Sequence, residues 1–188
     1  YDGLGLFSAA RLLWLFHLYG FTNVFILDGG LPKWLSENKA VESKIVMHEQ
    51  CHFLTSYCKE LVMDLDQMLA CIGSNDVHIV DARSHKRFEG LVPEPREGVR
   101  SGKIPSSVNL FYGDLIGEDY TLKPTQALEE IVKSLGINLN KHIVASCGSG
   151  VTAAILYIVF KGLGAKRVSV YDGSWCEWGS IDDLALLT

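Results

Sequence analysis

The chain has 188 residues, of which 48% are hydrophobic and 21% are charged, and its formal net charge at pH 7 is −5. This composition is typical of a soluble globular protein that is long enough to bury a sizeable core. The negative charge and the absence of a long basic run argue against nucleic-acid binding, and apolar stretches such as residues 153–160 are too short to span a membrane.

Helices and strands are expected to alternate along the chain. The hydrophobic pattern and the glycine and proline positions predict helices over residues 8–19, 65–72, 84–89, 124–135 and 152–162. They predict strands over residues 24–27, 77–81, 108–110, 143–146 and 168–171. Residues 172–175 are expected to form a turn and residues 91–103 a loop. This alternation predicts an α/β fold, with a mainly parallel sheet flanked by helices.

Two parts of the chain follow the same pattern, which indicates an internal duplication. Residues 28–34 and 172–178 each run from an Asp-Gly pair to a tryptophan, and an alanine pair begins both preceding helices. Where the second copy has Cys147, the first has Asp2 and Gly3, so the first copy lacks a cysteine.

We therefore expect one complete domain preceded by the C-terminal part of another. The predicted ranges are 1–42 for the partial, non-catalytic domain, 43–63 for a linker and 64–188 for the catalytic domain. The chain begins at Tyr1 with residues that look like the interior of a domain, which predicts a fragment or a processed form.

The cysteines indicate a reducing environment. Their odd number and irregular spacing do not form a disulfide framework, so a cytoplasmic or mitochondrial location is predicted. The spacing of His48, Cys51, His52 and Cys58 matches no strong zinc pattern, and we expect no metal and no cofactor. We also expect a monomer or a weak dimer. The five cysteines are Cys51, Cys58, Cys71, Cys147 and Cys176.

Cys147 stands at the turn between a predicted strand and a predicted helix, followed by Gly148-Ser149-Gly150. Backbone N–H groups in such a turn point into the loop, and the start of the helix adds a partial positive charge. This setting favours a thiolate over a thiol, and a thiolate is a nucleophile. Cys147 is therefore the candidate catalytic residue.

Several motifs together resemble a known fold. Asp81-Ala82-Arg83, the run Gly102–Pro105, the Cys147 loop and residues 171–175 resemble the rhodanese fold. The loop 147–152 is similar to that of the 3-mercaptopyruvate sulfurtransferases, a family of tandem-rhodanese enzymes, and so is the stretch from Arg87 to Arg96. Asp81 and Arg83 themselves are expected to be structural.

The resemblance implies sulfur transfer through a persulfide. The Cys147 thiolate would take sulfur from 3-mercaptopyruvate and release pyruvate, and a thiol acceptor such as thioredoxin would remove the sulfur. Arg87 and Arg96 would hold the carboxylate and keto oxygens, for which guanidinium groups are suited. The candidate site residues are Cys147 and Ser149 for catalysis, and Arg87, Arg96, Gly148, Gly150, Val151 and Thr152 for substrate binding.

One part of the family pattern has no counterpart here. The family pairs the serine matching Ser149 with an aspartate and a histidine from the early first domain, a region that would precede Tyr1. Asp2 and His17 are not assigned these roles. The chain is therefore expected to bind sulfur but to turn over slowly or not at all.

Three alternatives remain open. Thiosulfate could be the sulfur donor, although the uncharged Gly148-Ser149 disfavours a doubly charged donor. A cysteine-dependent phosphatase would need an arginine six positions after Cys147, where Ala153 stands. A non-catalytic persulfide carrier or interaction module would fit an incomplete first domain.

Overall fold

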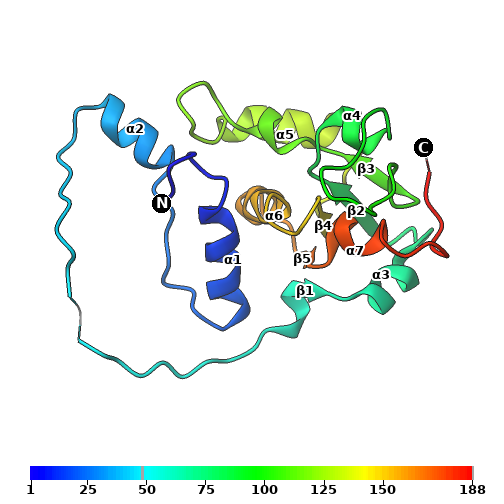
Figure 1. The fold of residues 1–188 in the computed structure, drawn as a ribbon, viewed down its shortest axis with the longest axis horizontal. Coiled ribbons are helices and arrows are strands. Elements are labelled where there is room, and N and C mark those ends of the chain that lie inside the picture. Colours follow the sequence, from blue (N-terminus) through cyan, green and yellow to red (C-terminus); the bar gives the residue numbers. More distant parts are fainter. Residues whose placement is uncertain (48, 188) are drawn as a thin grey trace.

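The computed structural model describes residues 1–47 and 49–187. A five-stranded sheet in the order β1-β5-β4-β2-β3 lies at its centre, and every neighbouring pair of strands is parallel (Figure 1). The strands are β1 (Val62–Met63), β2 (Val77–Asp81), β3 (Ser107–Asn109), β4 (His142–Ser146) and β5 (Arg167–Tyr171). The helices are α1 (Ala9–Leu18), α2 (Gly30–Ser36), α3 (Leu65–Cys71), α4 (His85–Phe88), α5 (Thr125–Ser134), α6 (Ala153–Gly162) and α7 (Ser174–Trp178).

The predicted α/β fold with a parallel sheet is confirmed, and so are the five predicted helices. The strand predicted over residues 24–27 is wrong, because these residues have no strand assignment. A strand needs a neighbour for its backbone hydrogen bonds, and no described strand pairs with this segment. The turn predicted over residues 172–175 is shorter than expected, since α7 already begins at Ser174.

The strands contribute alternate side chains to two separate cores, as the geometry of a strand requires. In β4, Ile143 and Ala145 pack with residues of α5 and α6, whereas Val144 packs on the opposite face with residues of α3 and α7. Because both faces are covered, successive residues of β4 from Ile143 to Ala145 are all apolar. The sequence therefore predicts a strand at residues 143–146, but it does not predict which side chains point to which face of the sheet.

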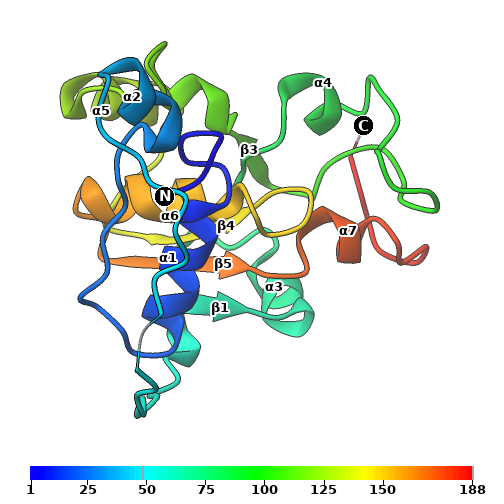
Figure 2. The same ribbon diagram turned by 60° about the vertical axis from the view of Figure 1, so that its left-hand side comes forward.

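Helix α1 lies against α6, outside the sheet (Figures 1 and 2). Trp14 is fully buried there, and its indole N–H donates to the Leu61 carbonyl at 3.0 Å. The Asp2 carboxylate accepts hydrogen bonds from the N–H groups of Leu4, Ser8 and Ala9 at the start of α1. Burial acts to raise the pKa of Asp2, but these hydrogen bonds outweigh it and the pKa is lowered.

A buried histidine links β4 to β5. The His142 side chain donates from Nε2 to Ser169 Oγ at 2.8 Å, because the Ser169 hydroxyl itself donates to the Glu60 carbonyl at 2.7 Å. Burial, together with the nearby Arg167 charge, lowers the pKa of His142 to about 4, from an ordinary value of 6.5. The folded protein therefore keeps this side chain neutral at a pH where the unfolded chain binds a proton.

We predict that the free energy of unfolding decreases as the pH falls from about 6.5 to about 4. The unfolded state binds the His142 proton over this range and the folded state does not, so about 2 kcal/mol is lost between pH 7.5 and pH 5. Urea unfolding of the wild type and His142→Gln at both pH values measures this loss.

The pH dependence should be smaller in His142→Gln than in the wild type. His17 and His78 also have lowered pKa values, but both proteins contain them, so their effect cancels in the comparison. The exposed His52 provides a control, since His52→Gln should keep the wild-type pH dependence. Equal pH dependence in wild type and His142→Gln would contradict the prediction.

The carboxyl ends of the parallel strands meet at one edge of the sheet. Helices α4 and α7 lie beyond that edge, as Figure 2 shows. Asp81, Ser146 and Tyr171 end β2, β4 and β5, so the segments that follow these residues come together. In open α/β sheets this edge is the usual place for a ligand site.

Candidate active site

A cavity of about 510 Å³ lies at this edge of the sheet. Cys147 is 2% exposed, and its side chain contributes to the cavity wall together with the loop that follows it. The other walls come from four parts of the chain: the segment before α1, the residues from Arg83 through α4 and the loop after it, the segment after β3, and α7. The lining residues are Phe7, Arg83, Ser84, Arg87, Glu94, Pro95, Arg96, Phe111, Tyr112, Cys147, Gly148, Ser149, Val151, Thr152 and Cys176.

The loop between β4 and α6 presents free backbone donors. Among the described residues, the N–H groups of residues 148–152 have no backbone or side-chain acceptor. Thr152 is the N-cap of α6, and its side chain makes no capping hydrogen bond. Unpaired N–H groups at the start of a helix attract an anion. The loop can therefore hold a negative charge on or beside the Cys147 sulfur.

Helix α7 holds this loop in place. The Cys147 N–H donates to Ser174 Oγ at 3.2 Å, and the Ser174 hydroxyl donates to the Tyr171 carbonyl at 2.8 Å. The N–H groups of Trp175 and Cys176 donate to the Cys147 and Gly148 carbonyls at 2.9 and 2.8 Å. These bonds fix the backbone on both sides of the sulfur.

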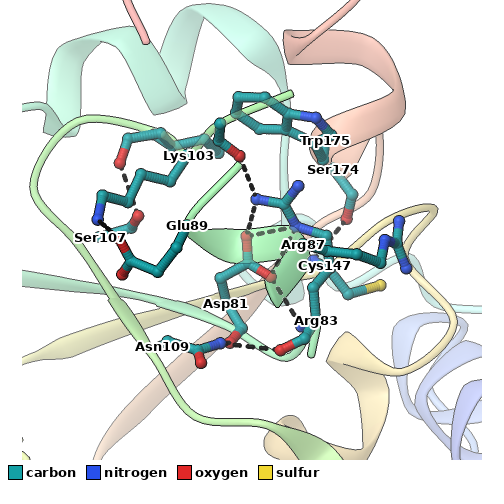
Figure 3. A network of polar contacts seen from close by, with 12 residues as sticks. Asp81, Arg83, Arg87, Glu89, Lys103, Ser107, Asn109, Cys147, Ser174 and Trp175 are labelled. Atoms are coloured by element: carbon teal, nitrogen blue, oxygen red, sulfur yellow. Dashed lines mark hydrogen bonds and ion pairs between the residues drawn. The ribbon is translucent and has the colours of Figure 1, made fainter. Parts of the chain in front are cut away.

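Arg83 anchors a buried ion-pair network beside the cavity. Its side chain is 0% exposed and pairs with Asp81 at 2.8 Å and with Glu94 at 2.9 Å. It also donates to the Gly102 carbonyl and lies over the Trp175 ring. Figure 3 shows the Arg83 guanidinium enclosed by its partners. Asp81 and Arg83 thus connect the carboxyl end of β2 to the loop after α4.

Arg87 shares Glu94 with Arg83 but faces the cavity. Its guanidinium contacts the Glu94 carboxylate at 2.5 Å, and its side chain is 27% exposed. Burial acts to lower the pKa of Arg87, but the hydrogen bond and charge of Glu94 outweigh it and the pKa is raised. Figure 3 places the Arg87 guanidinium and the Cys147 sulfur on the same side of the network. Glu94 therefore holds a cation in front of the sulfur.

The structure brings most of the predicted site residues to one cavity. Arg87, Arg96, Gly148, Ser149, Val151 and Thr152 all line it together with Cys147. Gly150 does not line it, since its backbone has a φ of +77° and packs against Asp172. Arg11 of α1 donates to the Gly150 carbonyl at 3.3 Å and pairs with Asp172 at 2.5 Å, so α1 supports the loop from behind.

Gly148 lies close to the end of the Arg87 side chain. A Cβ atom at residue 148 would lie 2.9 Å from Arg87 Nη2, which is too close for a non-bonded contact. A side chain at this position would displace the guanidinium. The absence of a side chain at residue 148 thus leaves room for the Arg87 guanidinium in its present position.

Sequence reasoning missed three contributors. Glu94 belongs to the Pro93–Arg96 run, but nothing in that run indicates that its carboxylate bridges two arginines. Arg11 lies 139 residues from its partner Gly150. The repeat places Cys176 near the catalytic region, but the sequence suggests only a structural or regulatory thiol, whereas the structure places it in the cavity lining.

No group of three or more residues suited to a metal ion occurs among residues 1–47 and 49–187. His48, one member of the weak metal pattern, lies outside the described residues. Within the same ranges, no helix has the length and apolar character needed to cross a membrane.

A buried cysteine followed by a loop of unpaired N–H groups, at the carboxyl edge of a parallel sheet, defines an α/β protein with a thiol in a loop suited to an anion. Residues 64–181 match the family model for the rhodanese-like domain. The chain belongs to the rhodanese-like family.

Its curated relatives include sulfurtransferases. The chain is 38% identical to thiosulfate/3-mercaptopyruvate sulfurtransferase 2 of Arabidopsis thaliana, over 100% of this chain and 61% of the relative. It is also 38% identical to the 3-mercaptopyruvate sulfurtransferase of Escherichia coli K12, over 98% of this chain and 65% of the relative. The chain thus spans less than two thirds of the length of these relatives.

Solved structures show the same fold. SseA from Escherichia coli, described as a 3-mercaptopyruvate sulfotransferase with the rhodanese fold, has a TM-score of 0.81 and 35% identity, covering 93% of this chain and 65% of that chain. A structure of EanB with a cysteine persulfide and ergothioneine has a TM-score of 0.86 and 25% identity, covering 96% of this chain and 45% of that chain.

Proposed function

We propose that this chain carries out persulfide-based sulfur transfer, with 3-mercaptopyruvate as donor and a thiol such as thioredoxin as acceptor. The observation that carries the proposal is the cavity that Cys147, Arg87 and Arg96 line together, beside unpaired loop N–H groups. The names of the sulfurtransferase relatives support the same class of reaction. The reaction needs no metal and no cofactor, because the thiolate itself is the nucleophile.

The donor fits the charges of the cavity. 3-Mercaptopyruvate has one carboxylate and one keto group, and the guanidinium groups of Arg87 and Arg96 provide planar donors for these oxygens. The Cys147 thiolate attacks the donor sulfur, the carbon–sulfur bond breaks, and the enolate of pyruvate leaves with the electron pair. Ser149, which is exposed beside the cavity, donates a hydrogen bond to that enolate. The loop N–H groups stabilise the persulfide anion.

Thiosulfate is the second candidate donor, because the Arabidopsis relative is named for both donors. We expect 3-mercaptopyruvate to be preferred, since a doubly charged donor gains more from cations in the loop, and Gly148 and Ser149 are uncharged. A phosphatase is disfavoured because Ala153, at the position that would need an arginine, is fully buried in α6.

The domain organisation is part of the proposal. Residues 1–42 form the C-terminal part of a first, non-catalytic rhodanese unit, followed by a linker at 43–63, whose last two residues join the sheet as β1, and the catalytic unit at 64–188. Both α2 and α7 begin with a residue in the left-handed region, Gly30 at φ +56° and Ser174 at φ +52°, which supports the duplication. A non-catalytic persulfide carrier remains the alternative, and a reducing compartment, cytosolic or mitochondrial, suits either function.

We predict that kcat/KM with 3-mercaptopyruvate exceeds that with thiosulfate by at least about tenfold. One charge-assisted contact between an arginine of the cavity and the donor carboxylate contributes about 1.5–3 kcal/mol, and thiosulfate has no carboxylate. Pyruvate release and sulfane sulfur transfer to a dithiol measure the two reactions. Ser149→Lys places a cation beside the loop and should move the preference toward thiosulfate.

The matched control is Ser180→Lys, in which the added charge lies outside the cavity lining. This variant should keep the wild-type preference. A wild-type preference for thiosulfate would overturn the choice of donor, and persulfide formation on Cys147 without turnover would favour the carrier.

A further inference from the structure

The candidate cavity contains a second thiol. The Cys176 side chain lines the same cavity as Cys147, whereas Cys51, Cys58 and Cys71 do not. Both cysteines are free thiols. The proposed function uses only Cys147, so the chemistry of Cys176 at this site is unassigned.

The backbone ties the two cysteines together. The Cys176 N–H donates to the carbonyl of Gly148, the residue after Cys147, at 2.8 Å. The neighbouring Trp175 N–H donates to the Cys147 carbonyl itself at 2.9 Å. Two successive residues of α7 therefore bond to two successive residues of the loop. This double contact holds the start of α7 against the Cys147 loop, and both cysteines line the one cavity.

The two thiols differ in their access to solvent. Cys147 is 2% exposed, whereas Cys176 is partly exposed. A small donor can reach a buried thiol through the cavity, but a protein acceptor needs sulfur at the surface. A persulfide on Cys147 extends its reactive sulfur by about 2 Å beyond the original Sγ, which moves it into the cavity that Cys176 lines.

We propose that Cys176 is a relay thiol that takes the outer sulfur from the Cys147 persulfide and presents it to acceptors at the protein surface. This inference rests on the proposed persulfide on Cys147. The Cys176 thiolate attacks the outer sulfur, the bond between that sulfur and Cys147 Sγ breaks, and Cys147 leaves as a thiolate. The product is a persulfide on Cys176. The exchange conserves atoms and electrons and needs no oxidant.

The relay empties Cys147 while sulfur is still bound to the protein. Cys147 can then react with a second donor molecule before any acceptor arrives. A chain with both cysteines should therefore hold about two sulfane sulfur atoms, and a chain without Cys176 about one, because each thiolate carries one sulfur atom.

The experiment treats the 188-residue chain with 3-mercaptopyruvate without an acceptor, alkylates it, and locates sulfane sulfur by peptide mass spectrometry. The wild type should carry sulfur on Cys147 first and on Cys176 later. Cys176→Ser should keep sulfur on Cys147 alone. Cys147→Ser should leave Cys176 unmodified, since the relay has no source of sulfur.

Cys71→Ser is the matched control, because Cys71 is a partly exposed cysteine outside the cavity, and its loss should leave sulfur on both Cys147 and Cys176. A persulfide on Cys147 with unmodified Cys176 would overturn the relay and leave the proposed function intact. Sulfur on Cys176 in Cys147→Ser would also overturn the relay. No persulfide on wild-type Cys147 would overturn the proposed function itself, and the relay with it.

Discussion

Sulfur transfer falls by at least about a thousandfold when Cys147 is replaced by serine, because a serine hydroxyl stays protonated and its oxygen forms no persulfide. The fold should survive this change, since Cys147 is held by its backbone. Its N–H donates to Ser174 Oγ, and its carbonyl accepts from Trp175. Sulfane sulfur transfer from 3-mercaptopyruvate to a dithiol measures the activity, and thermal unfolding of the same samples measures the stability.

Cys71→Ser is the control for this substitution as well, because it removes one thiol from α3 without altering the cavity. It should retain wild-type activity. Sulfur transfer by Cys147→Ser within tenfold of the wild type would show that another group is the nucleophile.

Replacing Glu94 by glutamine should affect both activity and stability. Glu94 is 2% exposed at its side chain and bridges Arg83 and Arg87, so the change leaves two guanidinium groups without their shared carboxylate. Removing one partner from a buried ion pair costs about 3 kcal/mol of stability. Loss of the charge-assisted hydrogen bond to Arg87 should lower kcat/KM about 10- to 100-fold, mainly through a higher KM.

Glu89→Gln is the matched control for Glu94→Gln. Glu89 also pairs with a cation, Lys103, at 2.7 Å, but it does not line the cavity. This variant should keep the wild-type KM. A fall in KM for Glu94→Gln would show that Glu94 acts on the donor through its charge, and it would contradict a role in holding Arg87.

The sequence predicts those helices and strands that follow from the pattern of their own residues. The apolar runs at residues 77–81 and 143–146 indicate strands because both faces of a parallel sheet are buried. The segment 24–27 has the same apolar character but forms no strand, because strand formation depends on a partner that the pattern of one segment does not include. The local pattern thus identifies a candidate strand, and pairing with a neighbouring strand determines whether that strand forms.

The residues of the candidate site also differ in whether the local sequence identifies them. Cys147 can be recognised from its own neighbours, a strand before it and glycines after it. Arg87 and Arg96 become candidates only through the family resemblance, and Glu94 becomes one only when the fold brings two arginines to it. Cys176 lies 29 positions from Cys147 in the sequence, and the pairing of α7 with the loop brings it to the cavity.

Two of the three ten-residue helices, α1 and α6, differ in the charge at their N-terminal ends. The Asp2 carboxylate gives α1 a permanent negative partner, bound to the N–H groups of Ser8 and Ala9. Among the described residues, no side chain accepts from the N–H groups of the loop before α6, so a negative partner is present there only while sulfur is ionised or an anion is bound. An anion that binds this loop only in the folded protein raises the free energy of unfolding by the free energy with which the loop binds it. The chain should accordingly be harder to unfold when an anion occupies this loop than when the loop holds none.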